Sequence, residues 1–176
     1  MKQAILVIDV QQALFDGSPP PQEADAVIAR INAMCARGRA AKVPVFLIQH
    51  EDQKSLLYGT SGWKLQGTLV ATQDDTVVRK QTPDAFLNTT LAYLLEQHGI
   101  KQVVIAGYAS EFCIDTTVRR AAALGYEVVI ASDAHTTHDK AHASGALIRQ
   151  HHNATLSAIS SFGHKIVAIP SGEVTF

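Results

Sequence analysis

Three side chains that can carry nucleophilic chemistry, Asp9, Lys80 and Cys113, each stand at or just beyond the end of an apolar run. A thiol attacks carbon as the thiolate, and a helix N-terminus or a nearby cation lowers its pKa from about 8.5. We expect Cys113 to have both aids, because it opens a predicted helix and Lys80 is cationic. Asp9 would take the thiol proton and later return it to a leaving amine, while Lys80 keeps Asp9 ionised. The set predicts acyl transfer through sulfur.

The elements that must position these side chains follow from the hydrophobic pattern. Continuous β-branched runs predict strands buried on both faces, and apolar residues at helical spacing predict helices between them. The first helix is expected to stop at Gly38. The predicted strands are residues 4–10, 43–49, 76–79, 102–106, 127–131 and 165–169, and the predicted helices are residues 23–37, 88–98, 112–124 and 143–160.

Strands and helices alternate along the whole chain, which indicates the α/β class. We predict a three-layer, doubly wound, mainly parallel sheet of order 3-2-1-4-5-6, in a single domain over residues 1–176. Ligands of such sheets bind beyond the carboxyl ends of the strands, where the strand order reverses. That edge lies between the first and fourth strands, so Asp9, Lys80 and Cys113 are expected to converge there.

Small residues precede Cys113 in the segment 107–110, which is Gly-Tyr-Ala-Ser. A tight turn of this kind exposes backbone amides, so these amides and that of Cys113 are candidates for an oxyanion hole. Glu111 lies beside them, and no role follows for it from the sequence.

The stretch from His50 to Asp75 has no clear periodicity, and a long irregular stretch inside a domain is usually functional or mobile. We expect it to set specificity, together with aromatic side chains that line a pocket. The alternative for each aromatic residue is ordinary core packing. The predicted substrate-binding residues are Phe15, Trp63, Phe86 and Tyr108.

The amino-acid composition limits the classes of binding partner that we expect. Hydrophobic residues make up 47% of the 176 residues, charged residues 18%, and the formal net charge is -1. We therefore expect a globular protein with a small-molecule substrate and with neither nucleic acid nor membrane as a partner. The first residues do not have the pattern of a signal peptide, and two cysteines make no disulfide framework, so a cytoplasmic location is expected.

The histidine run His135, His138 and His142 has spacings that invite a metal site. No cysteine or pair of carboxylates completes such a site, so we expect none here. Cys35 lies on the apolar side of the first predicted helix and is expected in the core.

Three segments in order resemble the isochorismatase-like cysteine hydrolases: LVIDVQQALF (residues 6–15), VVRKQTPDAF (77–86) and VVIAGYASEFCIDTTVRRAAALGYEVVIASDA (103–134). The resemblance covers nearly the whole chain. It implies the 3-2-1-4-5-6 sheet, a triad at Cys113, Asp9 and Lys80, and an oxyanion hole from the amides of Ala109 and Cys113. It also implies a cis peptide bond between Tyr108 and Ala109, and commonly a dimer or tetramer.

One departure from the family pattern concerns metal. Nicotinamidases of this superfamily carry Asp-x-His after the second strand, where this chain has Gln49-His50-Glu51-Asp52. The resemblance therefore implies no metal and no cofactor. Retention of Cys113 implies cleavage of an amide-type C–N bond, rather than the thiol-independent vinyl ether cleavage of isochorismatases, which remains the alternative and would use Asp9.

Proteins of other classes are less consistent with the sequence. A dinucleotide-binding module would need G-x-G-x-x-G after the first strand, where this chain has Asp9-Val10-Gln11-Gln12. A redox protein would need a resolving cysteine near Cys113, and Cys35 is distant in sequence. A non-enzymatic interaction protein would have no need of the intact Asp-Lys-Cys set.

Overall fold

The computed structural model describes residues 1–176 and contains a six-stranded sheet of order β3-β2-β1-β4-β5-β6. Every pair of neighbouring strands is parallel. The predicted class and strand order are therefore confirmed. The strands are β1 (Gln3–Ile8), β2 (Val45–His50), β3 (Thr76–Lys80), β4 (Gln102–Tyr108), β5 (Glu127–Thr136) and β6 (Ile166–Ile169).

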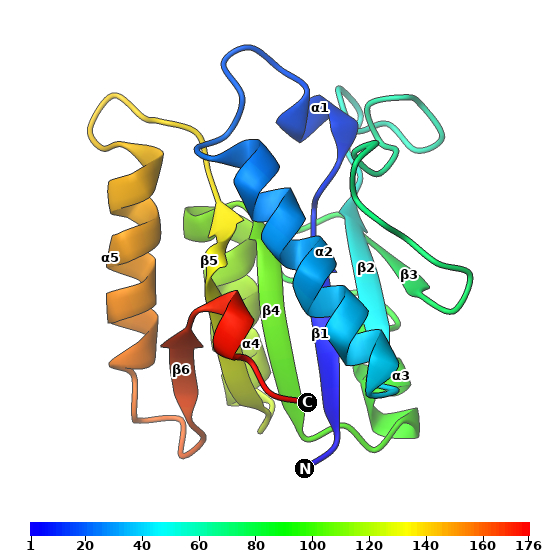
Figure 1. Ribbon diagram of the computed structural model, residues 1–176, viewed down its shortest axis with the longest axis vertical. Helices are drawn as coiled ribbons and strands as arrows, with labels where there is room; N and C mark the ends of the chain where they lie inside the picture. The colour runs from blue at the N-terminus through cyan, green and yellow to red at the C-terminus, as the bar shows by residue number, and fades with distance from the viewer.

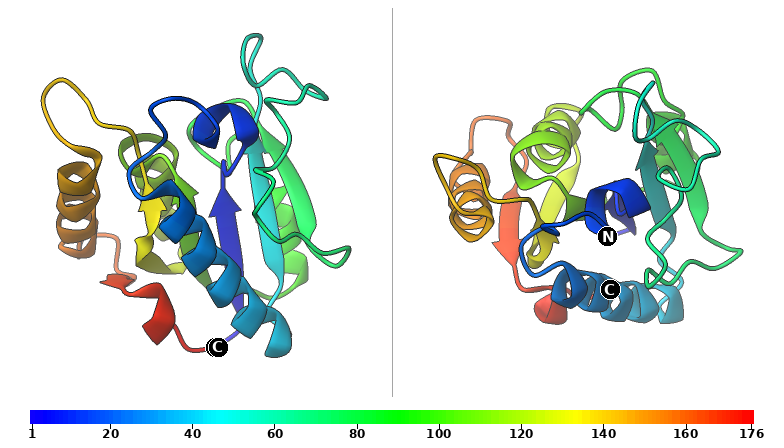
Figure 2. Two further views of the ribbon diagram at one scale, coloured as in Figure 1. Left: turned by 45° about the horizontal axis from the view of Figure 1, so that its top comes forward. Right: turned by 90° about the horizontal axis from the view of Figure 1, so that it is seen from above.

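Helices cover both faces of this sheet (Figure 1). The long helix α2 lies across one face, with the short η2 beside it, and α3, α4 and α5 pack on the other. Seen from above the carboxyl edge, the two helical layers enclose the strands between them (Figure 2). The helices are α1 (Gln12–Phe15), α2 (Ala24–Ala40), α3 (Leu91–Gln97), α4 (Asp115–Ala123) and α5 (Gly145–Ser157), with a π-helical turn η1 (Ser110–Ile114) and a 3-10 turn η2 (Ser171–Glu173).

Strand β1 shows why the strands are apolar throughout. Its alternate residues Ala4, Leu6 and Ile8 join the cluster under α3 and α4, whereas Ile5 and Val7 join the cluster under α2. Because side chains alternate across a strand, burial on both faces requires an apolar residue at every position. None of the helices combines the length and apolarity that crossing a membrane would require.

Gly107 lets β4 approach β1 at the carboxyl edge. Its φ is +122°, and a Cβ atom built there would lie 2.0 Å from the carbonyl oxygen of Ile8. Only glycine tolerates both conditions. The close approach brings the end of β4 against the end of β1, where Asp9 follows.

Helix α2 continues through Gly38 to Ala40, so the predicted stop at Gly38 is wrong. Gly38 packs against Ile5, and a Cβ atom there would lie 2.4 Å from the Ile5 Cδ1 atom. The glycine thus allows the helix to lie close to the sheet, a packing role that local sequence does not distinguish from a helix stop.

The helical segment that contains Cys113 also differs from the prediction. It starts at Ser110 with the π-helical turn η1, and regular α-helix starts only at Asp115. Cys113 is therefore the fourth residue of the turn and does not open a helix. Strand β5 is longer than predicted and ends at Thr136, which places His135 in the sheet.

Candidate active site

Asp9, Lys80 and Cys113 meet at the carboxyl edge of the sheet, as the topology predicted. Asp9 follows β1, Lys80 ends β3, and Cys113 lies in η1 after β4. Strand β2 separates β3 from β1, and the long lysine side chain reaches across its end. The site therefore draws on strands on both sides of the point where the strand order reverses.

The Lys80 ammonium is the centre of this cluster. It donates to Asp9 Oδ2 at 2.7 Å and contacts Cys113 Sγ at 3.2 Å. It also contacts His50 Nδ1 at 3.1 Å and donates to the Thr82 carbonyl oxygen at 3.1 Å. The Lys80 side chain is fully buried and that of Asp9 nearly so. A buried charge needs partners of this kind, because an unpaired one would be expensive.

These contacts bear on the question of a metal. Ligand atoms of Asp9, His50 and Cys113 lie within 4.8 Å of one another, which is a possible geometry for a metal ion. The Lys80 ammonium, however, lies within 3.2 Å of an atom of each of the three. A cation there would have to sit beside that charge and compete for the same lone pairs. The residues do not fit a bound metal while Lys80 is in place.

Asp9 has one carboxylate oxygen free. Oδ2 is bound to Lys80, whereas Oδ1 is buried and has no hydrogen-bond partner. The residue has a φ of +54°, a left-handed conformation that Asp adopts more readily than most residues. An unsatisfied buried acceptor is uncommon and calls for an explanation. Next to a thiol, Oδ1 is an acceptor ready for a proton.

Cys113 is protonated in this arrangement, contrary to the expected lowering of its pKa. Burial, and after it the charge of Asp9, raises the pKa of the Cys113 thiol to about 12, although Lys80 opposes the shift. Attack by sulfur at neutral pH must therefore be coupled to transfer of the thiol proton.

The turn between β4 and Cys113 leaves an amide without an acceptor. The peptide bond between Tyr108 and Ala109 is cis, as the family resemblance implied. The Ala109 carbonyl accepts hydrogen bonds from the amides of Phe112 and Ile114, and it accepts none from the amide of Cys113 between them. Ala109 itself is buried, and its own N–H has no hydrogen-bond acceptor. A buried free donor near a nucleophile is what an oxyanion hole requires.

His50 is a member of the site that the sequence reasoning missed. The sequence places His50 in the absent metal motif and at the start of the irregular stretch, and it does not indicate the contact of His50 Nδ1 with Lys80. The available signal was its position at the end of β2, between the strands that carry Asp9 and Lys80. Two buried glutamines secure this region: Gln11 donates to the carbonyls of His50 and Trp63, and Gln49 donates to that of Trp63.

The four aromatic residues expected to bind substrate have different surroundings. Phe15 is buried in the core, and its ring packs edge-on against Tyr108. Phe86 is buried in the opposite core cluster and stacks on Tyr126, which agrees with the core-packing alternative. Trp63 is partly buried, and its indole N–H has no acceptor.

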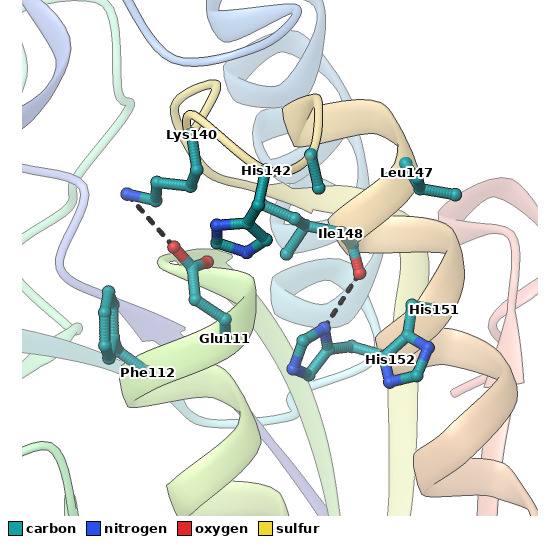
Figure 3. A pocket seen from close by; sticks show the side chains of 9 residues that line it. Glu111, Phe112, Lys140, His142, Leu147, Ile148, His151 and His152 are labelled. Carbon is teal, nitrogen blue, oxygen red and sulfur yellow. Dashed lines mark hydrogen bonds and ion pairs between the residues drawn. The ribbon is translucent and has the colours of Figure 1, made fainter.

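A cavity of about 470 Å³ lies between η1 and α5 (Figure 3). Glu111 and Phe112 border it, but none of Asp9, Lys80 and Cys113 is among its lining residues. Glu111 Oε1 accepts from Thr137 and pairs with Lys140, which gives Glu111 the structural partners that the sequence did not indicate. The lining residues are Glu111, Phe112, Lys140, His142, Ala143, Leu147, Ile148, His151 and His152.

Comparison with known proteins gives consistent matches. The isochorismatase-domain family model matches residues 3–161. A streptothricin hydrolase of Streptomyces noursei is 36% identical over 139 residues, or 78% of this chain and 50% of the hydrolase. The chain thus spans about half the length of that relative. Nicotinamidase 3 of Arabidopsis thaliana is 29% identical over 150 residues, covering 76% of this chain and 73% of the relative. The crystal structure of an isochorismatase family protein superposes with a TM-score of 0.88 at 31% identity, over 96% of this chain and 98% of that protein.

Proposed function

Since this chain belongs to the isochorismatase family, we propose that it is a cysteine hydrolase that cleaves an amide-type C–N bond of a small molecule. The observation that carries the proposal is the buried contact of Lys80 with both Asp9 and Cys113, beside the free Asp9 Oδ1. A hydrolase and a nicotinamidase among the relatives support the reaction class. The proposed unit is one domain over residues 1–176, with no cofactor.

In the first half-reaction, Cys113 Sγ attacks the carbonyl carbon while its proton passes to Asp9 Oδ1. The raised pKa of the thiol makes this coupling necessary, because little thiolate exists beforehand. The carbonyl oxygen becomes an oxyanion, to which the amides of Ala109 and Cys113 donate. The C–N bond then breaks, Asp9 gives its proton to the leaving nitrogen, and an acyl thioester remains on Cys113.

In the second half-reaction, water attacks the thioester carbon and Asp9 takes a proton from the water. The C–S bond breaks, the acid product leaves, and sulfur recovers its proton from Asp9. Lys80 stays charged throughout, so it stabilises whichever of Asp9 and Cys113 carries the negative charge. One carboxylate thus serves both steps.

The test is acyl capture from small amides. We expect hydroxylamine to divert turnover to hydroxamate, and a poor substrate to leave an acyl mass on the Cys113 peptide. Cys113→Ala should abolish turnover, whereas Cys35→Ala, a buried residue away from the site, should have little effect. If Cys113→Ala kept its activity, Asp9-centred vinyl ether chemistry would replace the thiol mechanism.

Substrate contacts are part of the same proposal. We place the scissile group among Tyr108, Trp63 and Phe15, whereas Phe86 packs in the core cluster on the opposite face of the sheet. The free indole N–H of Trp63 supports a polar contact, and the Phe15 and Tyr108 rings support an apolar one.

We also propose that the protein is a cytoplasmic homo-oligomer, a dimer or tetramer. Phe112 and Leu147, each 54% exposed beside the cavity of Figure 3, are apolar side chains that an interface would cover. Light scattering on the purified protein should give twice or four times the mass of 18.9 kDa, and a mass equal to one chain would refute the assembly.

A further inference from the structure

A buried chain of hydrogen bonds joins η1 to α5 through the sheet. Ser110 Oγ and His135 Nδ1 are 2.8 Å apart, and both residues are fully buried. His135 Nε2 lies 2.9 Å from Asn153 Oδ1, and Asn153 Nδ2 donates to the Ser132 carbonyl oxygen at 2.8 Å. The proposed mechanism uses none of these side chains, yet the chain of hydrogen bonds ends at Ser110, one residue from Ala109.

The hydrogen atoms of this chain have one consistent arrangement. Because Asn153 Nδ2 donates to a backbone carbonyl, its Oδ1 must accept. His135 Nε2 therefore carries the proton, and Nδ1 is the bare acceptor. Burial lowers the pKa of His135 to about 4, so the ring is neutral at neutral pH. The Ser110 hydroxyl is thus the donor to His135, which fixes its orientation.

The position of Ser110 connects this chain of hydrogen bonds to the candidate oxyanion hole. Ser110 is the first residue of η1 and follows Ala109, whose buried amide has no acceptor. The end of β5 and the loop after it also hold the turn on either side, through Thr137 to Glu111 and His138 to Tyr108. Of these three contacts, only that of His135 lies wholly in the interior.

We propose that His135 and Asn153 are positioning residues for acyl transfer: acting through Ser110, they hold the turn that presents the Ala109 amide to the oxyanion. The inference rests on the proposed function, since it needs an oxyanion formed on Cys113. Reactions of Cys113 that form no oxyanion should not depend on this chain of hydrogen bonds.

Two reactions of the Cys113 sulfur, one that forms an oxyanion and one that does not, can be compared to test this. Acylation by p-nitrophenyl acetate passes through a tetrahedral oxyanion, whereas alkylation by iodoacetamide does not. In Ser110→Ala, we expect acylation to slow by about 10-fold, since small misplacements of catalytic groups are costly, while alkylation keeps its rate. Asn153→Leu should slow acylation in the same selective way.

The matched control is Thr136→Val. Thr136 is buried beside His135, but its hydroxyl donates to the Gln22 carbonyl and not to η1. We expect both reactions at the rates of the unaltered protein. Equal acylation in Ser110→Ala and the parent would overturn the proposal, and so would a proportional fall in acylation and alkylation, which marks a merely structural role. Failure of the proposed function is distinct, because Cys113→Ala would then still hydrolyse amides.

A second variant tests the direction of the hydrogen bonds. Asn153→Asp sets a carboxylate against Nε2–H and raises the pKa of His135. Below that pKa, Nδ1 gains a proton and can no longer accept from Ser110. Acylation should therefore fall at acid pH relative to the parent. The charges of Arg149 and His152 on α5 and of Asp133 on β5 also act on the His135 ring, but these residues are common to both proteins. Identical pH profiles would refute the assigned tautomer.

Discussion

At the scale of single residues, the candidate site is organised around the buried ammonium of Lys80. The Lys80 ammonium contacts Asp9, Cys113, His50 and a backbone carbonyl, and it has only three hydrogens for these four acceptors. Burial and Asp9 together keep the thiol protonated. In the proposed mechanism, the Cys113 thiol and the Asp9 carboxylate therefore act together as one acid–base pair.

The proposed role of Asp9 as base predicts the behaviour of Asp9→Asn. Asn has nearly the same shape but cannot take the thiol proton, so acylation by p-nitrophenyl acetate at pH 7 should fall by about 100-fold or more. The rate in the variant should rise with pH, because thiolate must then form without help. Circular dichroism should confirm a folded variant, since Lys80 loses its counter-charge. A rate equal to that of the parent would exclude Asp9 as the base.

The position of Lys80 predicts the response to chelators. The ammonium takes up the lone pairs that a metal at Asp9, His50 and Cys113 would need. Prolonged treatment with EDTA or phenanthroline should therefore leave the acylation rate unchanged. Elemental analysis showing one zinc or iron per chain, with loss of activity on its removal, would contradict this expectation.

At the scale of elements, the important unit is β4, its turn and η1. The turn is confined on three sides: Gly107 sets it against β1, the end of β5 holds Ser110, and the Ala109 carbonyl takes two amides of η1. Cys113 is thereby carried on a turn that is tied to two neighbouring strands. Strand packing thus fixes the backbone position of Cys113, the proposed nucleophile.

Gly107→Ala tests how tightly this unit is packed. A methyl group 2.0 Å from the Ile8 carbonyl oxygen, at a φ of +122°, requires β4 to move away from β1. We expect the free energy of unfolding to fall by roughly 3 kcal/mol or more, measured by urea denaturation. Gly17→Ala is the control, because nothing lies within 4 Å of the added atom. Similar midpoints for the two variants would show that the close approach is not required.

At the scale of the whole molecule, helices cover both faces of the sheet and bury its strands (Figures 1 and 2). Asp9, Lys80 and Cys113 meet at the carboxyl edge of this sheet. The same burial constrains polar groups inside the fold. His135 is fully enclosed and held neutral, so the folded protein resists a proton that the unfolded chain would accept.

That difference predicts how stability depends on pH. Burial lowers the pKa of His135 from 6.5 to about 4, so its contribution is present above pH 6.5 and is lost as pH falls toward 4. At about 1.4 kcal/mol per pKa unit, the loss is on the order of 3 kcal/mol. Urea unfolding between pH 4 and 7 measures it, and His135→Gln should give a shallower slope. Equal slopes in both proteins would contradict the buried, neutral assignment.

The sequence by itself determined the class, the strand order, and the convergence of Asp9, Lys80 and Cys113. Strands buried on both faces must be apolar throughout, and the carboxyl ends of parallel strands lie at one edge of the sheet. The strands and the edge where the three side chains meet can therefore be predicted from the order of residues alone. The tertiary structure alone decided the start of η1, the continuation of α2 through Gly38 and the raised pKa of Cys113. These depend on which surfaces meet and how much water they exclude.

The same reason explains the residues that the sequence did not single out for the site. His50 and His135 owe their places to neighbours distant in the chain, Lys80 for one and Ser110 with Asn153 for the other. The local sequence pattern carries no information on such contacts, because a polar residue at one strand end cannot be distinguished from a polar residue at another until the neighbouring elements are known. The sequence therefore indicated the three side chains that meet at the carboxyl edge, and packing decided which groups contact them.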